Sequence, residues 1–122
     1  MPTPEQVRAA VDAYVSAYST SDREAFLSVW SPEAWIIDPV GSPVSQGPDG
    51  RAAFWDSVHA LSPEIRLIAR DVVVCADEAA VTLEIHAAGS VIDAIDIFSV
   101  DDSGRISSMK AYWDMARMRQ AD

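Results

Sequence analysis

Residues 65–113 decide the fold, and they read IRLIARDVVVCADEAAVTLEIHAAGSVIDAIDIFSVDDSGRISSMKAYW. This stretch holds four runs rich in β-branched and other apolar residues, at 65–74, 79–87, 91–100 and 105–113. The gaps between the runs are only a few residues long, which suits hairpin turns. The stretch therefore predicts four strands that pair in chain order as an antiparallel meander.

The residues before this stretch favour helices. Thr3-Pro4-Glu5-Gln6 predicts a helix start, because Thr3 and Gln6 have capping-box spacing and proline suits the first turn. The residues that follow form one apolar face at helical spacing, made of Val7, Ala10, Val11, Tyr14, Val15 and Tyr18. A second capping box at 21–24, with Ser21 as the cap, predicts a short helix as far as Trp30.

A short strand at 35–40, a loop at 41–50 rich in glycine and proline, and a third helix at about 51–61 are expected next. Three helices followed by a long meander are typical of an α+β fold in which the helices pack on one face of a curved antiparallel sheet. Such a sheet forms a cone with an apolar interior, which is a natural ligand pocket. A short irregular or helical tail is expected at 115–120.

Length and charge narrow the functions further. The 122 residues suit one domain, spanning 1–122. Nineteen Asp and Glu against nine Lys and Arg give a net charge of -10, which disfavours nucleic acid and anionic membrane surfaces as partners. Cys75 is the only cysteine, so neither an internal disulfide nor a cysteine-based metal site is expected. The first residues lack the basic and apolar segments of a secretion signal, so we expect a cytoplasmic protein.

Two acidic residues stand among apolar ones. Strand alternation puts Asp38 on the same face as Ile36, and Asp96 on the same face as Phe98. A carboxyl in such surroundings is costly to ionise, so the pKa of each should rise. The alternative is that Asp38 caps the loop after its strand and that Asp96 lies exposed at a sheet edge. Tyr14 lies on the apolar stripe of the first helix, where a core aromatic is the ordinary interpretation.

The chain resembles bacterial Δ5-3-ketosteroid isomerase over nearly its whole length, to about Trp113. The resemblance rests on Tyr14 in the first helix, Asp38-Pro39-Val40-Gly41-Ser42 after a short strand, and Ile95-Asp96-Ile97-Phe98 in a late strand. The segments 76–80 and 104–110 agree with it as well. It implies the cone-shaped NTF2-like fold, which SnoaL-like polyketide cyclases, scytalone dehydratase and nuclear transport factor 2 share, and it implies a homodimer.

The roles of individual residues follow from this resemblance. Asp38 would be the general base that takes a proton from C4 of a steroid and returns it at C6. Tyr14 and Asp96 would donate hydrogen bonds to the C3 oxygen as a dienolate forms, which requires a protonated Asp96. The positions that match the family's steroid-lining residues are Phe54, Met109 and Trp113, with Val40 and Trp55 beside them. The resemblance implies no cofactor and no metal ion.

Two tryptophans depart from the family pattern. Relatives carry a tyrosine where this chain has Trp55, and a tyrosine or phenylalanine at Trp30. In some of them those hydroxyls form a network with the catalytic tyrosine. An indole N–H only donates a hydrogen bond, so it cannot replace such a chain of hydroxyls. The sequence therefore predicts that Tyr14 lacks hydroxyl support and that Asp96 carries more of the stabilisation.

The resemblance thus implies a cofactor-free steroid Δ-isomerase that acts on small apolar 3-oxo-Δ5 steroids. Two alternatives stay open. A related polyketide cyclase or dehydratase would use the same aspartate on another substrate, and a steroid- or lipid-binding protein would keep the pocket without turnover. Retention of all three polar positions favours an enzyme, because a binding protein has no need of a base near C4.

Overall fold

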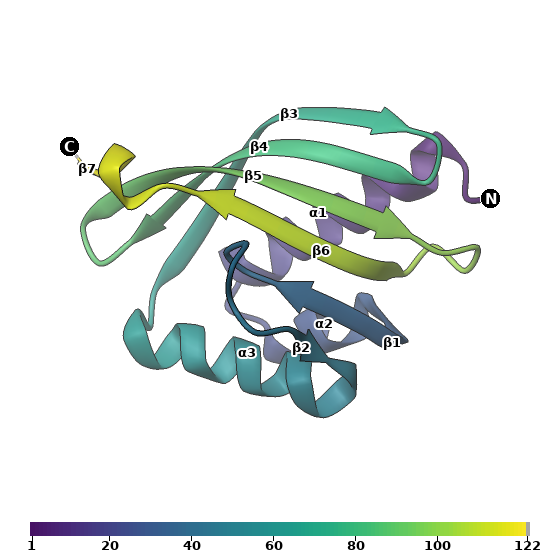
Figure 1. The fold of residues 1–122 in the computed structure, drawn as a ribbon, viewed down its shortest axis with the longest axis horizontal. Helices are drawn as coiled ribbons and strands as arrows, with labels where there is room; N and C mark the ends of the chain where they lie inside the picture. The colour runs from purple at the N-terminus through teal and green to yellow at the C-terminus, as the bar shows by residue number, and fades with distance from the viewer. Residues whose placement is uncertain (122) are drawn as a thin grey trace.

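The computed structural model describes residues 1–121, in which three helices pack against a curved sheet of seven strands (Figure 1). The helices are α1 (Pro4–Ser19), α2 (Arg23–Ser28) and α3 (Gly47–Leu61), with a 3₁₀ turn, η1 (Met115–Arg117), near the C-terminus. The strands are β1 (Trp30–Ile37), β2 (Ser45–Gln46), β3 (Ile65–Cys75), β4 (Glu78–Ala87), β5 (Ser90–Val100), β6 (Ile106–Trp113) and β7 (Arg119–Gln120). This arrangement confirms the expected α+β fold.

The strands lie in the order β2-β1-β6-β5-β4-β3, and β7 pairs with the start of β5. The neighbours β3, β4, β5 and β6 are antiparallel, which confirms the predicted meander. β1 departs from this pattern, because it joins the edge of β6 in the parallel direction. The chain between β1 and β6 includes α3 and the strands β3 to β5, so the parallel pairing needs no tight turn.

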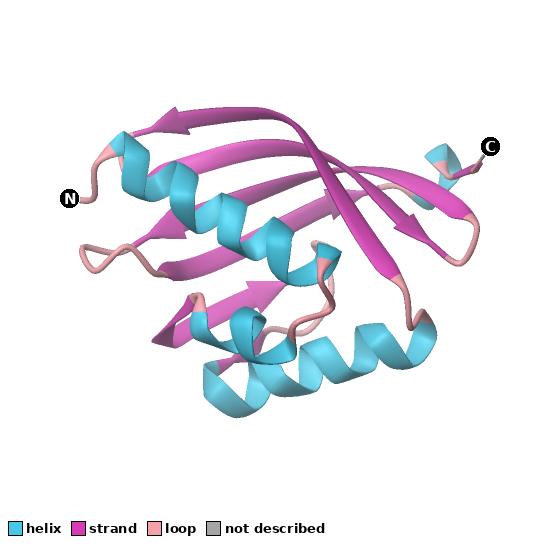
Figure 2. Ribbon diagram, turned by 180° about the vertical axis from the view of Figure 1, so that it is seen from behind, coloured by secondary structure: helices cyan, strands magenta, loops and turns pink. Residues whose placement is uncertain are grey.

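Irregular pairing helps to bend the sheet around the helices. The register between β3 and β4 shifts between Ala69 and Asp71. A bulge of this kind increases the local twist and bend of a strand. In Figure 2, β3 curves along its length and α1 crosses the concave face of the sheet. The largest fully buried side chains are Phe26, Phe98, Ile36, Ile106 and Met109, together with Val7, Val11, Val81 and Val100.

The start of α1 is built as the sequence predicts. Thr3 Oγ1 accepts a hydrogen bond from the Gln6 amide at 3.1 Å, and Gln6 Oε1 accepts one from the Thr3 amide at 2.8 Å. These two bonds satisfy amide groups that the first helical turn leaves free. The predicted apolar stripe is buried except for the half-buried Val15, so both Tyr14 and Tyr18 face the interior.

Two predictions about the segment after α1 are wrong. The N-cap of α2 is Asp22 and not the predicted Ser21. The Asp22 side chain accepts a hydrogen bond from the Ala25 amide at 3.0 Å. Ser21 has a φ of 51°, outside the extended region that an N-cap adopts. The second difference is that β1 begins at Trp30, where the sequence predicts the end of a helix. Pro32 is tolerated in this strand because the register with β6 is broken there.

The predicted loop at 41–50 is also shorter than expected. It contains β2, and α3 already begins at Gly47 with Pro48 in its first turn. Glycine and proline are typical of loops, but proline fits the first turn of a helix, where its missing N–H has no partner to lose. Within residues 1–121, no helix combines the length and the apolar character needed to cross a membrane.

The C-terminal tail contacts β5, where β7 pairs with the first residues of that strand. The sequence predicts an irregular or helical tail here, and the η1 turn agrees with it, but Arg119–Gln120 form β7, which the sequence does not predict. Arg119 donates hydrogen bonds to Asp93 at 2.8 Å and to Glu84 at 2.9 Å, and Glu84 also accepts one from Arg70. Glu84 is only 7% exposed, so these cations compensate a carboxylate that has little contact with water.

Candidate active site

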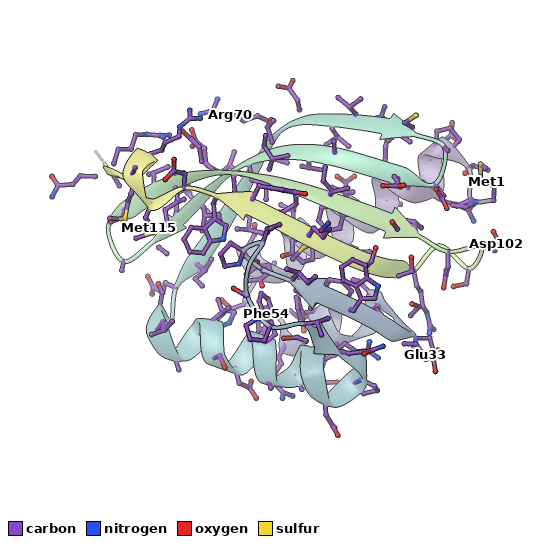
Figure 3. The ribbon with its side chains drawn as sticks, in the orientation of Figure 1. Met1, Glu33, Phe54, Arg70, Asp102 and Met115 are labelled. Atoms are coloured by element: carbon purple, nitrogen blue, oxygen red, sulfur yellow. The ribbon has the colours of Figure 1, made fainter. Side chains whose placement is uncertain are left out.

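An interior cavity of about 70 Å³ lies between α1, α3 and the concave face of the sheet. The residues that line it are Tyr14, Tyr18, Asp38, Phe54, Val58, Ile65, Leu67, Leu83, Ile85 and Asp96. The structure thus brings the three residues predicted to be catalytic to one cavity, although they come from α1, from the end of β1 and from β5. Apart from Tyr14, Asp38, Asp96 and Tyr18, the side chains that line the cavity are apolar. Figure 3 shows Phe54 extending from α3 toward the sheet.

Tyr14 enters the cavity from the buried face of α1. Its ring packs edge-on against Phe98 at a centroid distance of 5.0 Å and against Trp30 at 5.9 Å. Burial raises the pKa of Tyr14 well above its ordinary value, and the nearby Tyr18 and Asp96 act in the same direction. The phenol therefore keeps its proton at neutral pH and is available as a hydrogen-bond donor.

Asp96 enters from the middle of β5, which has β4 on one side and β6 on the other. It is 3% exposed, so the alternative that it lies exposed at a sheet edge is wrong. Burial raises its pKa well above the ordinary value, and the negative charge of Asp38 raises it further. No charged partner compensates this carboxyl within residues 1–121, so the protonated form is the favoured one.

Asp38 directly follows β1, beside a cis peptide bond to Pro39. Its side chain is only partly buried, and Oδ1 accepts a hydrogen bond of 2.8 Å from the indole Nε1 of Trp113. Burial raises the pKa of Asp38, and the hydrogen bond from Trp113 opposes that rise because it stabilises the carboxylate. The two carboxyls on this cavity therefore differ, with Asp38 easier to ionise than Asp96.

The five predicted substrate-binding residues lie in different places. Phe54 lines the interior cavity. Trp113 is hydrogen-bonded to Asp38, which lines the cavity. Met109 is buried in the core on β6. Trp55 is buried as well, but it packs on Tyr18, Phe26 and His59 and does not line the cavity. Val40 is half-exposed and lies outside it.

A larger groove of about 570 Å³ lies on the other side of Trp113. It is lined by Pro39, Val40, Arg70, Thr82, Leu83, Asp93, Ala94, Ile95, Tyr112, Trp113, Asp114 and Arg117. Leu83 lines both spaces, and Trp113 lines the groove while bonding to Asp38 of the cavity. The Trp113–Asp38 contact therefore lies between the interior cavity and the larger groove.

Tyr18 is the polar cavity residue to which the sequence analysis assigned no functional role. It lies four residues after Tyr14 on α1, the spacing at which two helical residues share a face. The sequence signal was present, because Tyr18 belongs to the same apolar stripe. That stripe does not distinguish a phenol on a cavity wall from one in a solid core. The described residues contain no group of three or more His, Cys, Asp or Glu placed to hold a metal ion.

Fold and site together define a small α+β protein that encloses two acids and two phenols in an apolar cavity. The sequence matches the SnoaL-like domain family over residues 11–109, and the chain belongs to that family. The steroid Delta-isomerase of Nocardioides simplex is 28% identical to it over 110 residues, which make up 88% of this chain and 89% of that protein.

Solved structures of other proteins share the fold. The epoxide hydrolase/cyclase-like enzyme SalBIII, described for pyran ring formation in polyether salinomycin, has a TM-score of 0.90 and 22% identity, covering 99% of this chain and 100% of its own. RV0760c from Mycobacterium tuberculosis, in complex with estradiol-17beta-hemisuccinate, has a TM-score of 0.84 and 22% identity, covering 93% of this chain and 98% of its own. These likenesses establish the cone-like NTF2-like fold.

Replacing Trp113 should change the ionisation of Asp38. Trp113→Phe keeps an aromatic ring but removes the N–H donor, so burial acts unopposed and the pKa of Asp38 should rise further. Carbon NMR titration of the Asp38 carboxyl measures this directly. Trp35→Phe, which removes an indole from β1 that makes no bond to Asp38, is the matched control. An unchanged or lower Asp38 pKa in Trp113→Phe would contradict the assigned role.

The raised pKa of Asp96 predicts a pH-dependent stability. In the unfolded chain this carboxyl ionises near its ordinary pKa of about 3.9, whereas in the fold it keeps its proton to higher pH. The stability from this group is complete below the unfolded pKa and is lost as the pH rises toward the folded pKa. Asp96→Asn has no such proton to lose, so its stability relative to wild type should increase with pH.

Urea unfolding at a series of pH values above about 4 measures this difference. Asp93→Asn is the matched control on the other face of β5. Its hydrogen bond from Arg119 lowers the pKa of Asp93, so the stability from this group is already complete above the unfolded pKa, and the difference between this variant and wild type should stay nearly constant over this pH range. A difference between Asp96→Asn and wild type that stays constant with pH would show that burial does not perturb this carboxyl.

Proposed function

We propose that this protein is a steroid Δ-isomerase that converts 3-oxo-Δ5 steroids to 3-oxo-Δ4 steroids through a dienolate. One observation carries the proposal: a more easily ionised carboxyl and two buried proton donors, namely Asp38, Tyr14 and Asp96, line a single apolar cavity. The relationship to the steroid Delta-isomerase of Nocardioides simplex supports the same reaction. The estradiol derivative bound to RV0760c supports a steroid-shaped ligand.

Asp38 moves the proton in the proposed reaction. It takes a proton from C4, and the electrons of that C–H bond enter the conjugated system as the C3 oxygen becomes negative. Trp113 binds Oδ1, which leaves Oδ2 as the atom that accepts the proton. The same carboxylic acid then returns the proton to C6, so the double bond moves from C5–C6 to C4–C5 and no co-reactant is consumed. The raised pKa of Asp38 suits a group that must both accept and return a proton.

Tyr14 and Asp96 stabilise the negative charge that develops on the C3 oxygen. Burial keeps both groups protonated, so both can donate hydrogen bonds to this oxygen. Fixed donors in an apolar cavity stabilise a developing charge more strongly than water does. Asp38 becomes neutral as the oxygen becomes negative, so the net charge of the cavity stays constant during the step.

The substrate must displace part of the cavity wall. Pockets for ligands of steroid size usually have volumes of about 300 Å³ or more, whereas the unliganded cavity has about 70 Å³. Phe54 and Trp113 are the large, only partly buried side chains at this wall. We therefore expect them to shift when a steroid binds.

A cyclase or dehydratase is the second candidate function. It is favoured by the TM-score of 0.90 to SalBIII, which is described as epoxide hydrolase/cyclase-like. The same carboxylate and the same two donors would then move protons on a substrate that is not a steroid. The reaction would still depend on Asp38 as the base. The two functions therefore differ in their substrate and not in the residue that moves the proton.

The test is to mix the protein with 5-androstene-3,17-dione and follow the ultraviolet absorbance of the conjugated enone. A rise that depends on protein concentration supports the isomerase. Saturable quenching of tryptophan fluorescence by equilenin without turnover would instead identify a steroid-binding protein. No response to either steroid would favour a cyclase or dehydratase.

Asp38→Asn should lower kcat by several orders of magnitude while steroid binding survives or improves. The amide keeps the shape of the carboxylate but cannot accept a proton, and it removes a negative charge that faces an apolar ligand. The enone assay measures turnover, and equilenin titration measures binding. Asp93→Asn, on the opposite face of the sheet, is the control and should keep its turnover. Near-native turnover of Asp38→Asn would place the base elsewhere.

We also propose that two copies associate through the sheet face turned away from α1. This face carries exposed apolar side chains, with Val73 at 62% and Ile95 at 46% exposure, and their burial would favour association. Analytical ultracentrifugation should give twice the mass of one chain, and Ile95→Lys should weaken the association. A single-chain mass at all concentrations would contradict the proposal.

A further inference from the structure

Tyr18 is a second phenol on the wall of the interior cavity, one helical turn after Tyr14. Its ring lies edge-on to the Tyr14 ring, with centroids 5.3 Å apart and planes at 60°. The side chain is buried, and its hydroxyl belongs to the few polar groups in an otherwise apolar lining. No step of the proposed reaction uses it.

Trp30 does not provide a polar partner for Tyr14. Its ring also stands edge-on to Tyr14, but its Nε1 is buried and has no hydrogen-bond partner among the described residues. An indole N–H has no acceptor capacity, so Trp30 contributes a packing surface. The support of the Tyr14 hydroxyl therefore has to come from another side.

The Tyr18 hydroxyl is placed to give that support, because both phenols line the same cavity and their rings are in edge contact. Burial raises the pKa of Tyr18, and a hydrogen bond from the Tyr14 side chain opposes the rise. A phenol has one donor and two acceptor sites, and its hydrogen rotates to suit its partners. Without a ligand, the Tyr14 proton has the Tyr18 oxygen as a partner. When a ligand oxygen takes that proton, the Tyr18 hydroxyl can turn and donate to the Tyr14 oxygen.

Aromatic residues of α3 hold the Tyr18 ring in place. Trp55 lies 4.9 Å from it and His59 stacks on it at 5.8 Å, with planes 17° apart. Trp55 and His59 also stack on each other at 3.9 Å, and His59 Nδ1 donates to the Trp55 carbonyl at 2.9 Å. Because this stack fixes the ring, the hydroxyl of Tyr18 has little freedom to leave Tyr14.

We propose that Tyr18 is the positioning residue for Tyr14, with its hydroxyl donating to the Tyr14 oxygen while Tyr14 donates to the substrate oxygen. This inference rests on the proposed isomerase function. Tyr18 contacts no reacting atom in this scheme. Because hydrogen bonds in a chain polarise one another, its effect should grow with the charge on the substrate oxygen. It should therefore act more on kcat than on KM.

The test is a double-mutant cycle with Tyr14→Phe, Tyr18→Phe and the double variant. Tyr18→Phe keeps the ring and its packing but removes the hydroxyl. We expect a loss of about tenfold in kcat, the effect of one hydrogen bond, with little change in KM. In the Tyr14→Phe background the same change should cost nothing further, because Tyr18 then has no phenol to support. Tyr112→Phe, which removes an exposed phenol on β6, is the matched control.

Equilenin affinity is the second readout, because its phenolic oxygen binds without turnover. Tyr18→Phe should weaken equilenin binding when Tyr14 is present and leave it unchanged when Tyr14 is phenylalanine. Equal losses in both backgrounds, or no loss in either, would overturn the positioning role. Wild-type protein that binds equilenin but does not isomerise steroid would overturn the proposed function. The double-mutant cycle on equilenin affinity would still test the contact between Tyr14 and Tyr18. Failure of the wild type to bind equilenin would overturn both.

Discussion

The burial of the Asp96 carboxyl is the constraint on which the rest of the site depends. A carboxylate without a cationic partner is costly in an apolar cavity, so the fold must keep this group protonated or lose stability. A place on β5, with β4 and β6 on either side, removes water from it. The apolar lining leaves no opposite charge nearby. The same surroundings that make ionisation costly also make the neutral acid a hydrogen-bond donor.

The difference between the two carboxyls follows from where their strands end. Asp96 lies inside a strand and is enclosed on both sides, whereas Asp38 follows the last residue of β1 and keeps contact with solvent. The indole of Trp113 then stabilises the ionised form of Asp38. An ionised Asp38 in turn raises the pKa of Asp96. Two like charges on one small cavity are thus avoided, because the ionised Asp38 favours the protonated form of Asp96.

Local rules account for the parts of the fold and site that the sequence predicted. The four long strands, the capping box at Thr3 and the inward face of Asp96 follow from periodicity and neighbouring residues. The start of β1 and the early start of α3 were missed, because proline and glycine are compatible with loops, strand edges and first helical turns alike. The bond between Asp38 and Trp113 joins residues 75 positions apart, so only the tertiary fold brings it about.

The prediction that Tyr14 lacks hydroxyl support was drawn from positions 30 and 55 alone. Both positions hold indoles here, and both pack against aromatic rings, which is a structural contribution. The helix geometry of α1 provides the polar group instead, because residues four apart share a face and Tyr18 meets Tyr14 there. One helix then carries both phenols, so any shift of α1 along the sheet would move them together. The spacing between the two hydroxyls thus depends on the helix itself, while the aromatic stack of Trp55 and His59 on α3 fixes the Tyr18 ring.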